Sequence, residues 1–188
     1  MEKILIHTCC GPCFIGMYYD IMEERQIFKS DKKVQITSFY YNPNIQPFME
    51  YNRRKNTLEK FCDEVECDLI IVDDYNLTRF VNDSVNLDKN YRSRCEYCYY
   101  TRLEKTFEYA KTLGYTAVMT TLSISPYQNQ KLIEEIGNKL AKKYGIKYIH
   151  LDYTKIFRKG QKMAIDKKMY RQKYCGCIFS IDNGKWEY

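Results

Sequence analysis

The sequence predicts a Rossmann-like α/β fold, in which a mostly parallel sheet carries helices on both faces. Short apolar runs alternate along the chain with amphipathic segments of helical period, the βαβα pattern of such a sheet. The length of 188 residues, 45% of them hydrophobic and 29% charged, suits one domain over residues 1–188. Cysteine, asparagine and aspartate follow directly after the predicted strands, at the carboxyl edge where open α/β sheets bind ligands.

Five short apolar runs are expected to form the strands. They are rich in Ile, Val, Leu and Tyr, and polar or turn-forming residues follow them. In chain order they cover residues 4–6, 34–41, 69–72, 117–119 and 148–151.

Four long helices are expected between these strands, because apolar side chains recur there at helical spacing. Ser125 is expected to cap the fourth helix, with Pro126 in its first turn and Gln128 as its capping-box partner. The helical segments cover residues 14–22, 48–65, 100–110 and 132–144.

The first residues and the hydropathy pattern predict a cytoplasmic protein with no membrane partner. The chain begins Met1-Glu2-Lys3 before a run of only three apolar residues, and it has no run of 18 apolar residues. In a reducing compartment, nine cysteines are not expected to form structural disulfides. Metal binding, redox chemistry or burial explains their number better.

Seven of the nine cysteines fall into three sets with chelating spacing. The other two, Cys62 on an apolar helical stripe and Cys67 before a strand, are expected to pack as small hydrophobic residues. A C-x-x-C at the start of a helix lets two thiolates face one metal while the helix N-terminus stabilises their charge. Four thiolates suit zinc or an iron–sulfur cluster, and seven leave up to three for a second metal or a redox pair. The sets are Cys9, Cys10 and Cys13; Cys95 and Cys98; and Cys175 and Cys177.

Two alternative interpretations of the cysteines stay open. Residues Cys10-Gly-Pro-Cys13 spell the thioredoxin active-site tetrapeptide, which would make the chain a dithiol oxidoreductase. Here, however, the motif follows the first strand and another cysteine, and the only tryptophan is Trp186. The second alternative is a zinc-stabilised RNA-binding protein without catalysis. A Gly-rich phosphate loop and a nucleophilic triad are both absent from the sequence.

Positive charge and aromatic residues suggest a nucleic-acid partner. Residues 139–173 hold 12 basic and 2 acidic residues, in a chain of formal net charge +6. Residues 91–102 interleave tyrosine and arginine around Cys95 and Cys98, as surfaces that bind single-stranded RNA do. A solvated lysine face and the 19 tyrosines of the chain would explain these patterns as well.

The motifs together resemble the QueH-type epoxyqueuosine reductases of transfer-RNA modification, in order and over nearly the whole chain. One position departs from the family pattern, because Thr154 follows Asp152-Tyr153 where an arginine is expected. The motifs are His7-Thr-Cys-Cys-Gly-Pro-Cys13, Tyr41-Asn-Pro-Asn-Ile45 with Pro47, Glu50, Tyr51 and Arg54, Arg94-Cys-Glu-Tyr-Cys-Tyr99 with Arg102 and Leu103, Thr120-Thr-Leu122 with Ser125-Pro-Tyr127, and Tyr170-Arg-Gln-Lys-Tyr-Cys-Gly-Cys177 with Phe179-Ser180.

This resemblance implies a HUP-like form of the Rossmann-like fold and an oxidoreductase activity. The reaction implied is the last step of queuosine biosynthesis, the reduction of epoxyqueuosine to queuosine at the wobble position of transfer RNA. The partner implied is therefore a transfer RNA that carries epoxyqueuosine in its anticodon loop. The resemblance also implies an iron–sulfur enzyme without cobalamin, served by an electron donor that the sequence does not identify.

The reaction demands two electrons and stabilisation of a developing alkoxide. A [4Fe–4S] cluster supplies electrons singly, and an additional iron ion with an open position can polarise the oxygen. We expect Cys9, Cys10, Cys95 and Cys98 to hold the cluster, and Cys13, Cys175 and Cys177 to hold the additional iron and, with Asp152, to be catalytic. The substrate-binding residues implied by the resemblance are Tyr41, Asn42, Asn44, Arg54, Arg94, Arg102, Thr120, Thr121, Ser125, Tyr127 and Arg171.

Overall fold

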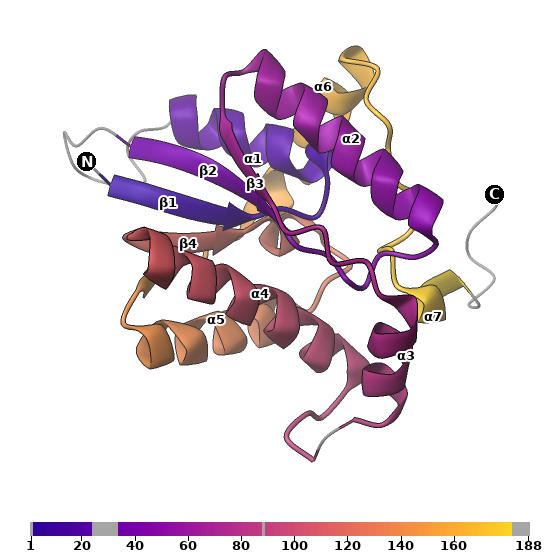
Figure 1. Cartoon of the computed structure of the whole chain (residues 1–188). Helices are drawn as coiled ribbons and strands as arrows, with labels where there is room; N and C mark the ends of the chain where they lie inside the picture. The colour runs from indigo at the N-terminus through magenta and orange to yellow at the C-terminus, as the bar shows by residue number, and fades with distance from the viewer. Residues whose placement is uncertain (1, 24–33, 88, 182–188) are drawn as a thin grey trace.

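The computed structural model describes residues 2–23, 34–87 and 89–181, and they are arranged around one five-stranded sheet (Figure 1). All strands are parallel, in the order β3-β2-β1-β4-β5, so the predicted fold class is confirmed. The strands are β1 (Glu2–His7), β2 (Val34–Tyr40), β3 (Asp68–Ile71), β4 (Ala117–Thr120) and β5 (Lys147–Tyr148).

The fifth strand is shorter than predicted. It ends at Tyr148, and the Ile149 amide still donates to the Val118 carbonyl before the chain leaves the sheet. The chain turns because the Asp152 carboxylate accepts from the Thr154 amide (3.1 Å) and caps the 3₁₀ turn Tyr153–Ile156. A local side-chain bond to the backbone has therefore displaced the strand that the apolar pattern predicted.

The four predicted long helices are present, and shorter helices follow the third and fifth strands and precede the C-terminus. Ser93 caps the helix that contains Cys95 and Cys98 by accepting from the Glu96 amide, and Gly114 ends that helix in the left-handed conformation. The helices are α1 (Gly11–Glu23), α2 (Phe48–Glu64), α3 (Leu77–Val85), α4 (Arg94–Leu113), α5 (Gln130–Tyr144), α6 (Phe157–Asp166) and α7 (Ile178–Ile181).

The predicted cap of α5 is wrong. Helix α5 begins at Gln130, and Asn129 caps it by accepting from the Leu132 amide (3.1 Å). The Ser125 hydroxyl instead accepts from the Tyr127 amide (3.3 Å), which forms a separate turn before the helix. Serine and asparagine are both good N-cap residues, and here Asn129, which directly precedes α5, caps the helix.

Helices cover both faces of the sheet, with α1, α2 and α6 on one side and α4 and α5 on the other (Figure 1). The alternation of the central strand β1 sends Ile4 and Ile6 into the first core and Leu5 into the second. Helices α1 and α6 approach closely at Gly16, where an added Cβ would lie 3.1 Å from Gly160 Cα. This contact places the segment after α6 near the N-terminus of α1.

Of the helices in the described part of the chain, none is long and apolar enough to cross a membrane.

The carboxyl ends of β1 and β4 lie side by side near the middle of the sheet. The strand order reverses there, since β2 lies on one side of β1 and β4 on the other. Open α/β sheets form their ligand crevice at such a switch point. The junction of β1 with α1, which contains Cys9, Cys10 and Cys13, lies at this point.

Candidate metal centre

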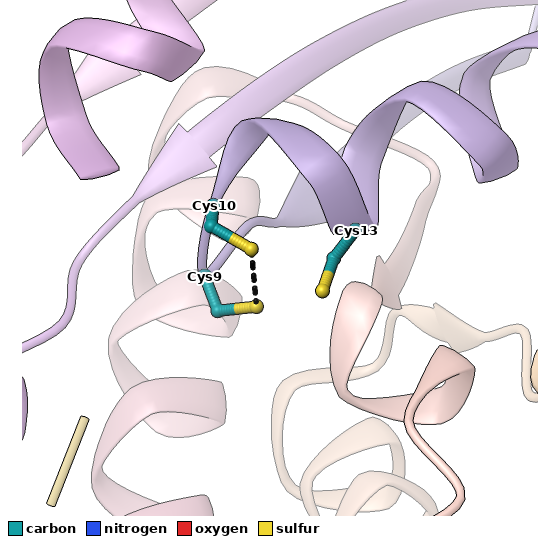
Figure 2. Close-up of side chains that lie close together, drawn as sticks. All are labelled: Cys9, Cys10 and Cys13. Carbon is teal, nitrogen blue, oxygen red and sulfur yellow. Dashed lines mark hydrogen bonds between the residues drawn. The ribbon is translucent and has the colours of Figure 1, made fainter. Parts of the chain in front are cut away.

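Three cysteine sulfurs converge where β1 meets α1. The ligand atoms of Cys9, Cys10 and Cys13 all lie within 4.8 Å of one another, and the Sγ atoms of Cys9 and Cys10 are 3.6 Å apart. Figure 2 shows the three side chains pointing toward a common space beside the first turn of α1. Cys10 and Cys13 are buried and Cys9 is partly buried. We call these residues the thiol trio.

Two side chains from distant parts of the chain hold the thiol trio. The Thr121 hydroxyl lies 3.4 Å from Cys9 Sγ and 3.0 Å from the Cys9 amide nitrogen, which donates to it. Gln172 donates through Nε2 to Cys10 Sγ at 3.0 Å and lies 3.6 Å from Cys13 Sγ. Gln172 belongs to a motif that the sequence analysis quoted, yet it was not predicted as a site residue. Its position three residues before Cys175 in that motif is the signal that could have drawn attention to it.

Proximity makes the three thiols titrate differently. Hydrogen bonding from Cys10 and Cys13 lowers the pKa of Cys9 well below its ordinary value. Burial raises the pKa of Cys10, and hydrogen bonding to its two neighbours raises the pKa of Cys13. The trio therefore loses its first proton from Cys9, while the other two thiols keep theirs until a cation compensates the charge.

His7, the last residue of β1, is a structural residue of this site. Burial lowers its pKa to about 3, so the ring is neutral at pH 7. Nε2 lies 3.3 Å from the Tyr41 carbonyl, to which it donates, and Nδ1 accepts from the Thr120 hydroxyl at 2.9 Å. Both nitrogens are thus occupied, and the bonds tie β1 to the loop after β2 and to the end of β4.

The other four predicted ligands form a second set at the start of α4 and in the segment before α7. Burial raises the pKa of Cys98 to about 12, and the nearby Cys177, Cys175 and Cys95 raise it further. Burial likewise raises the pKa of Cys177 to about 11, with added effects of Cys175 and Cys95. The Arg94 guanidinium, next to Cys95, lies 4.5 Å from the centre of the ring of Phe179, which follows Cys177 by two residues, so the two segments that carry the four cysteines are neighbours. We call these four cysteines the thiol quartet. Among the described residues, only the trio brings three candidate ligand atoms within 4.8 Å.

Arg54 holds the segment that carries half of the quartet. Its buried guanidinium donates to the carbonyls of Tyr174 (2.9 Å) and Cys175 (3.3 Å), and to Glu50 Oε1 at 2.7 Å. The Gln46 amide donates to the Gly176 carbonyl at 2.8 Å, and Gly176 has a φ of +99° that favours glycine. The structure gives Arg54 a role in positioning this segment, and the substrate contact implied for it stays a prediction.

A second buried arginine touches the quartet directly. Arg102 donates from Nη2 to Cys98 Sγ (3.1 Å) and from Nε to the Cys98 carbonyl (3.0 Å). Arg94, next to Cys95, is exposed, and its guanidinium lies 4.5 Å from the centre of the Phe179 ring. The described residues of α7 therefore pack against the start of α4.

The remaining predicted substrate-binding residues divide into buried and exposed ones. Asn42 and Asn44 are buried, and each has an amide oxygen without a hydrogen-bond partner in the structure. Asn42 Nδ2 donates to the Thr8 carbonyl at 2.9 Å, directly before the trio. Tyr127 and Arg171 are exposed. The buried group is Tyr41, Asn42, Asn44, Thr120 and Thr121, whereas Ser125 is partly buried.

Asp152 is also exposed, and among the described residues it belongs to no group of three candidate metal ligands. Hydrogen bonds from the Thr154 hydroxyl and amide lower its pKa below the ordinary value. Thr154, the residue that departs from the family pattern, thus hydrogen-bonds to the carboxylate of Asp152. The catalytic role expected for Asp152 stays a prediction.

The donor set of the trio fits a thiophilic metal centre. Three thiols without a competing carboxylate favour iron, zinc or an iron–sulfur cluster over hard cations. The backbone N–H groups at the N-terminus of α1 stabilise their negative charge. Three protein ligands also leave one position open, as catalytic metal sites do.

The model of one protein family, described as epoxyqueuosine reductase QueH, matches residues 4–183. This chain belongs to the QueH family. The QueH proteins of Thermotoga maritima and Dehalococcoides mccartyi are 30% and 31% identical to it, over 96% and 95% of this chain and 91% and 92% of theirs. The QueH protein of Haemophilus influenzae is 31% identical over 98% of this chain and 74% of its own. The resemblance stated from the motifs is thereby confirmed.

A solved structure shares the fold of this QueH protein. The U34-tRNA thiolase NcsA from Methanococcus maripaludis, solved with its [4Fe–4S] cluster, matches with a TM-score of 0.60 and 18% identity. The match covers 95% of this chain but 61% of the thiolase, so this QueH protein spans less than two thirds of that chain. The likeness supports the α/β fold class.

Proposed function

We propose that this chain reduces epoxyqueuosine to queuosine at the wobble position of transfer RNA. The observation that carries the proposal is the match of nearly the whole chain to the QueH family, together with a buried trio of thiols at the switch point of the sheet. The reaction removes the epoxide oxygen as water and leaves an alkene, which consumes two electrons and two protons. The electrons come from an external donor, and no cobalamin takes part.

Two ligand sets are available for iron. We assign the trio to the centre that faces the substrate, because it leaves an open position, and the quartet to the other centre. This partition differs from the one predicted from the sequence, which separated Cys13 from Cys9 and Cys10 by placing it with Cys175 and Cys177. The proximity of the three sulfurs supports the new partition. A [4Fe–4S] cluster and an additional iron ion together would supply single electrons and polarise the oxygen.

The residues of the chain prepare this site. Gln172 and Thr121 fix the sulfurs of the trio, and the N-terminus of α1 offsets their charge. Arg171 is exposed and directly precedes Gln172, and exposed Arg94 directly precedes Cys95. Each thiol set thus has an exposed arginine adjacent in sequence to one of its residues or supports, where the phosphates of an anticodon loop can be held.

The first test is an anaerobic purification followed by iron, sulfide and zinc analysis. We expect a brown protein with acid-labile sulfide that, with dithionite as the reductant, converts epoxyqueuosine transfer RNA to queuosine transfer RNA, detected by mass spectrometry of nucleosides. Stoichiometric zinc without sulfide would favour the RNA-binding alternative. Paired titration of Cys10 and Cys13 without iron would favour the dithiol oxidoreductase.

The assignment of the seven cysteines to two metal centres needs its own test. Cys175→Ser and Cys177→Ser should remove one centre and leave the iron of the trio in place, measured as iron and sulfide per chain. Cys13→Ser should do the reverse. If Cys13→Ser and Cys177→Ser remove the same irons, the partition predicted from the sequence is favoured instead.

Salt dependence tests the contact with RNA. Affinity for transfer RNA should fall by roughly 0.7 to 0.9 log units per log unit of salt for each phosphate contacted. Several exposed lysines of the basic segment take part in none of the described ion pairs and should contribute to this slope, among them Lys142, Lys155, Lys162 and Lys168. Their replacement by glutamine should flatten it more than replacement of Lys143, Lys159 and Lys167, which pair with Glu104, Glu23 and Glu64.

A further inference from the structure

The described residues include two buried arginines with different partners. Arg54 is 2% exposed and Arg102 is 4% exposed. Each donates from Nε to the residue four positions earlier in its helix, Arg54 to the Glu50 carboxylate and Arg102 to the Cys98 carbonyl. A carboxylate thus neutralises Arg54, whereas no ion pair among the described residues includes Arg102. The charge of Arg102 stays uncompensated by any acidic side chain.

An uncompensated guanidinium in the interior is costly. An arginine keeps its proton in proteins, so it does not escape the cost by becoming neutral. The partners that Arg102 does have are the Cys98 carbonyl, the Cys98 sulfur at 3.1 Å from Nη2, and the Tyr99 ring, whose centre is 5.8 Å from the guanidinium carbon. Of these, only the sulfur is a candidate metal ligand, and a cysteine sulfur carries a negative charge when it binds a metal. The buried guanidinium is therefore placed to compensate a metal-bound thiolate.

The charge of Arg102 also reaches the end of β1. Burial lowers the pKa of His7, and the charge of Arg102 lowers it further. His7 lies two residues before Cys9, while Cys98 belongs to the quartet. The guanidinium thus lies close enough to influence the end of β1 as well as the start of α4.

We propose that Arg102 is a positioning residue whose fixed positive charge compensates the anionic metal–thiolate centre at Cys98 and makes that centre easier to reduce. The proposal rests on the proposed function, because it requires a redox-active metal centre at the thiols. One electron from the external donor adds one negative charge to the centre, while Arg102 keeps its proton and all its bonds. A cation 3.1 Å from a ligand sulfur stabilises the more negative, reduced state more than the oxidised one.

The unpaired charge predicts opposite effects in the metal-free and the loaded protein. Without metal, the guanidinium has no anion to pair with, so replacing it by a neutral side chain of similar length relieves a cost. With metal, the same replacement removes the compensating charge. A residue that served packing alone would lower stability in both states and leave the reduction potential unchanged.

The test compares Arg102→Met, Arg102→Lys and the control Arg54→Met. The midpoint potential of the anaerobically loaded protein is measured by titration with dithionite and mediators, followed by visible absorbance and by electron paramagnetic resonance. We expect a more negative potential in Arg102→Met and recovery toward the wild-type value in Arg102→Lys. In the metal-free protein, the Tm of Arg102→Met should equal or exceed that of wild type. Arg54→Met should lower the Tm, because Glu50 loses its partner.

Two results would overturn the proposal: an unchanged midpoint potential in Arg102→Met, or a fall in the Tm of metal-free Arg102→Met as large as that of Arg54→Met. If Arg102→Met does not fold, an Arg102→Lys protein with the potential of wild type supports the role of charge, and a shifted one contradicts it. A wild-type protein without any reducible centre would overturn the proposed function itself, which separates the two failures.

Discussion

The thiol trio and the thiol quartet are built in different ways. The trio comes from five consecutive residues at one strand–helix junction, and its ligand atoms lie within 4.8 Å of one another. The quartet joins the first turn of α4 to a segment about eighty residues further along the chain, and Cys95 and Cys175 are exposed. Local sequence thus preorganises the first set, whereas tertiary contacts must assemble the second. Mutations outside the cysteines should therefore affect the two sets unequally.

The assembly of the quartet depends on a small number of long-range bonds. Arg54 and Gln46 hold the main chain of Tyr174, Cys175 and Gly176. The Tyr174 hydroxyl donates to the Gln46 carbonyl, and the Tyr170 hydroxyl to Glu50 Oε2. These bonds connect the start of α2 to the segment after α6, and no short-range pattern specifies them.

The largest effect is expected from a ligand of the trio. Cys10→Ser should remove the metal of this set and abolish turnover, because a hydroxyl is a much weaker ligand for thiophilic metals than a thiolate. Iron and sulfide per chain and the yield of queuosine are the measurements. Cys62→Ser, at an equally buried cysteine outside both sets, is the matched control and should keep both values. Retention of full iron in Cys10→Ser would show that the trio is not a ligand set.

Glu50→Gln should weaken metal binding by the quartet more than metal binding by the trio. The change leaves Arg54 buried without its counter-ion, which costs about 3–5 kcal/mol in the free energy of unfolding. The segment that Arg54 positions should loosen, so the quartet loses metal before the trio does. Denaturant titration and iron content measure the two effects. Asp73→Asn, which breaks the more exposed pair with Lys55, should cost only about 0–1 kcal/mol and serves as the control.

Gln172→Leu tests the outer support of the trio. Loss of the bond to Cys10 should weaken metal binding at the trio by about 10–100-fold, the usual effect of removing an outer hydrogen-bond partner. Competition with a chelator measures this loss, and the quartet should be unaffected. Gln35→Leu, which removes a bond to Asp68 on the sheet, is the matched control. Equal chelator sensitivity in both variants would contradict the role of Gln172.

The smallest effect is expected at the cysteines outside both sets. Cys62→Ser should reduce the free energy of unfolding by about 1–2 kcal/mol, since it buries a hydroxyl where a sulfur packs. Cys67→Ser should cost less, because Cys67 is only partly buried. Neither should change the iron content. Loss of iron from either variant would show that the replaced cysteine is a metal ligand outside the trio and the quartet.

Some features of the site were predictable and others were not, for physical reasons that particular residues show. The start of α4 was predictable from the C-x-x-C of Cys95 and Cys98, which suits the opening of a helix, and the structure adds the cap at Ser93. Ser125 was wrongly expected to cap α5, because Asn129 competes for the same helix end. Gln172 was missed as a support of the trio, since its contacts with Cys10 and Cys13 span about 160 residues of sequence.

By itself the sequence determined the fold class, four of the five strands nearly to their ends and the four long helices, and it predicted the seven candidate ligand cysteines. These features are encoded by period, spacing and local capping, which act over a few residues. The convergence of Cys13 with Cys9 and Cys10 follows from the local turn between β1 and α1, and helical spacing places Glu50 and Cys98 four positions before Arg54 and Arg102. Only the tertiary structure decided that both arginines are buried, that Arg54 also holds the carbonyls of Tyr174 and Cys175, and that the segment before α7 lies beside the start of α4. These long-range contacts depend on how α2, α4 and the segment after α6 pack at one edge of the sheet, which no local sequence pattern encodes.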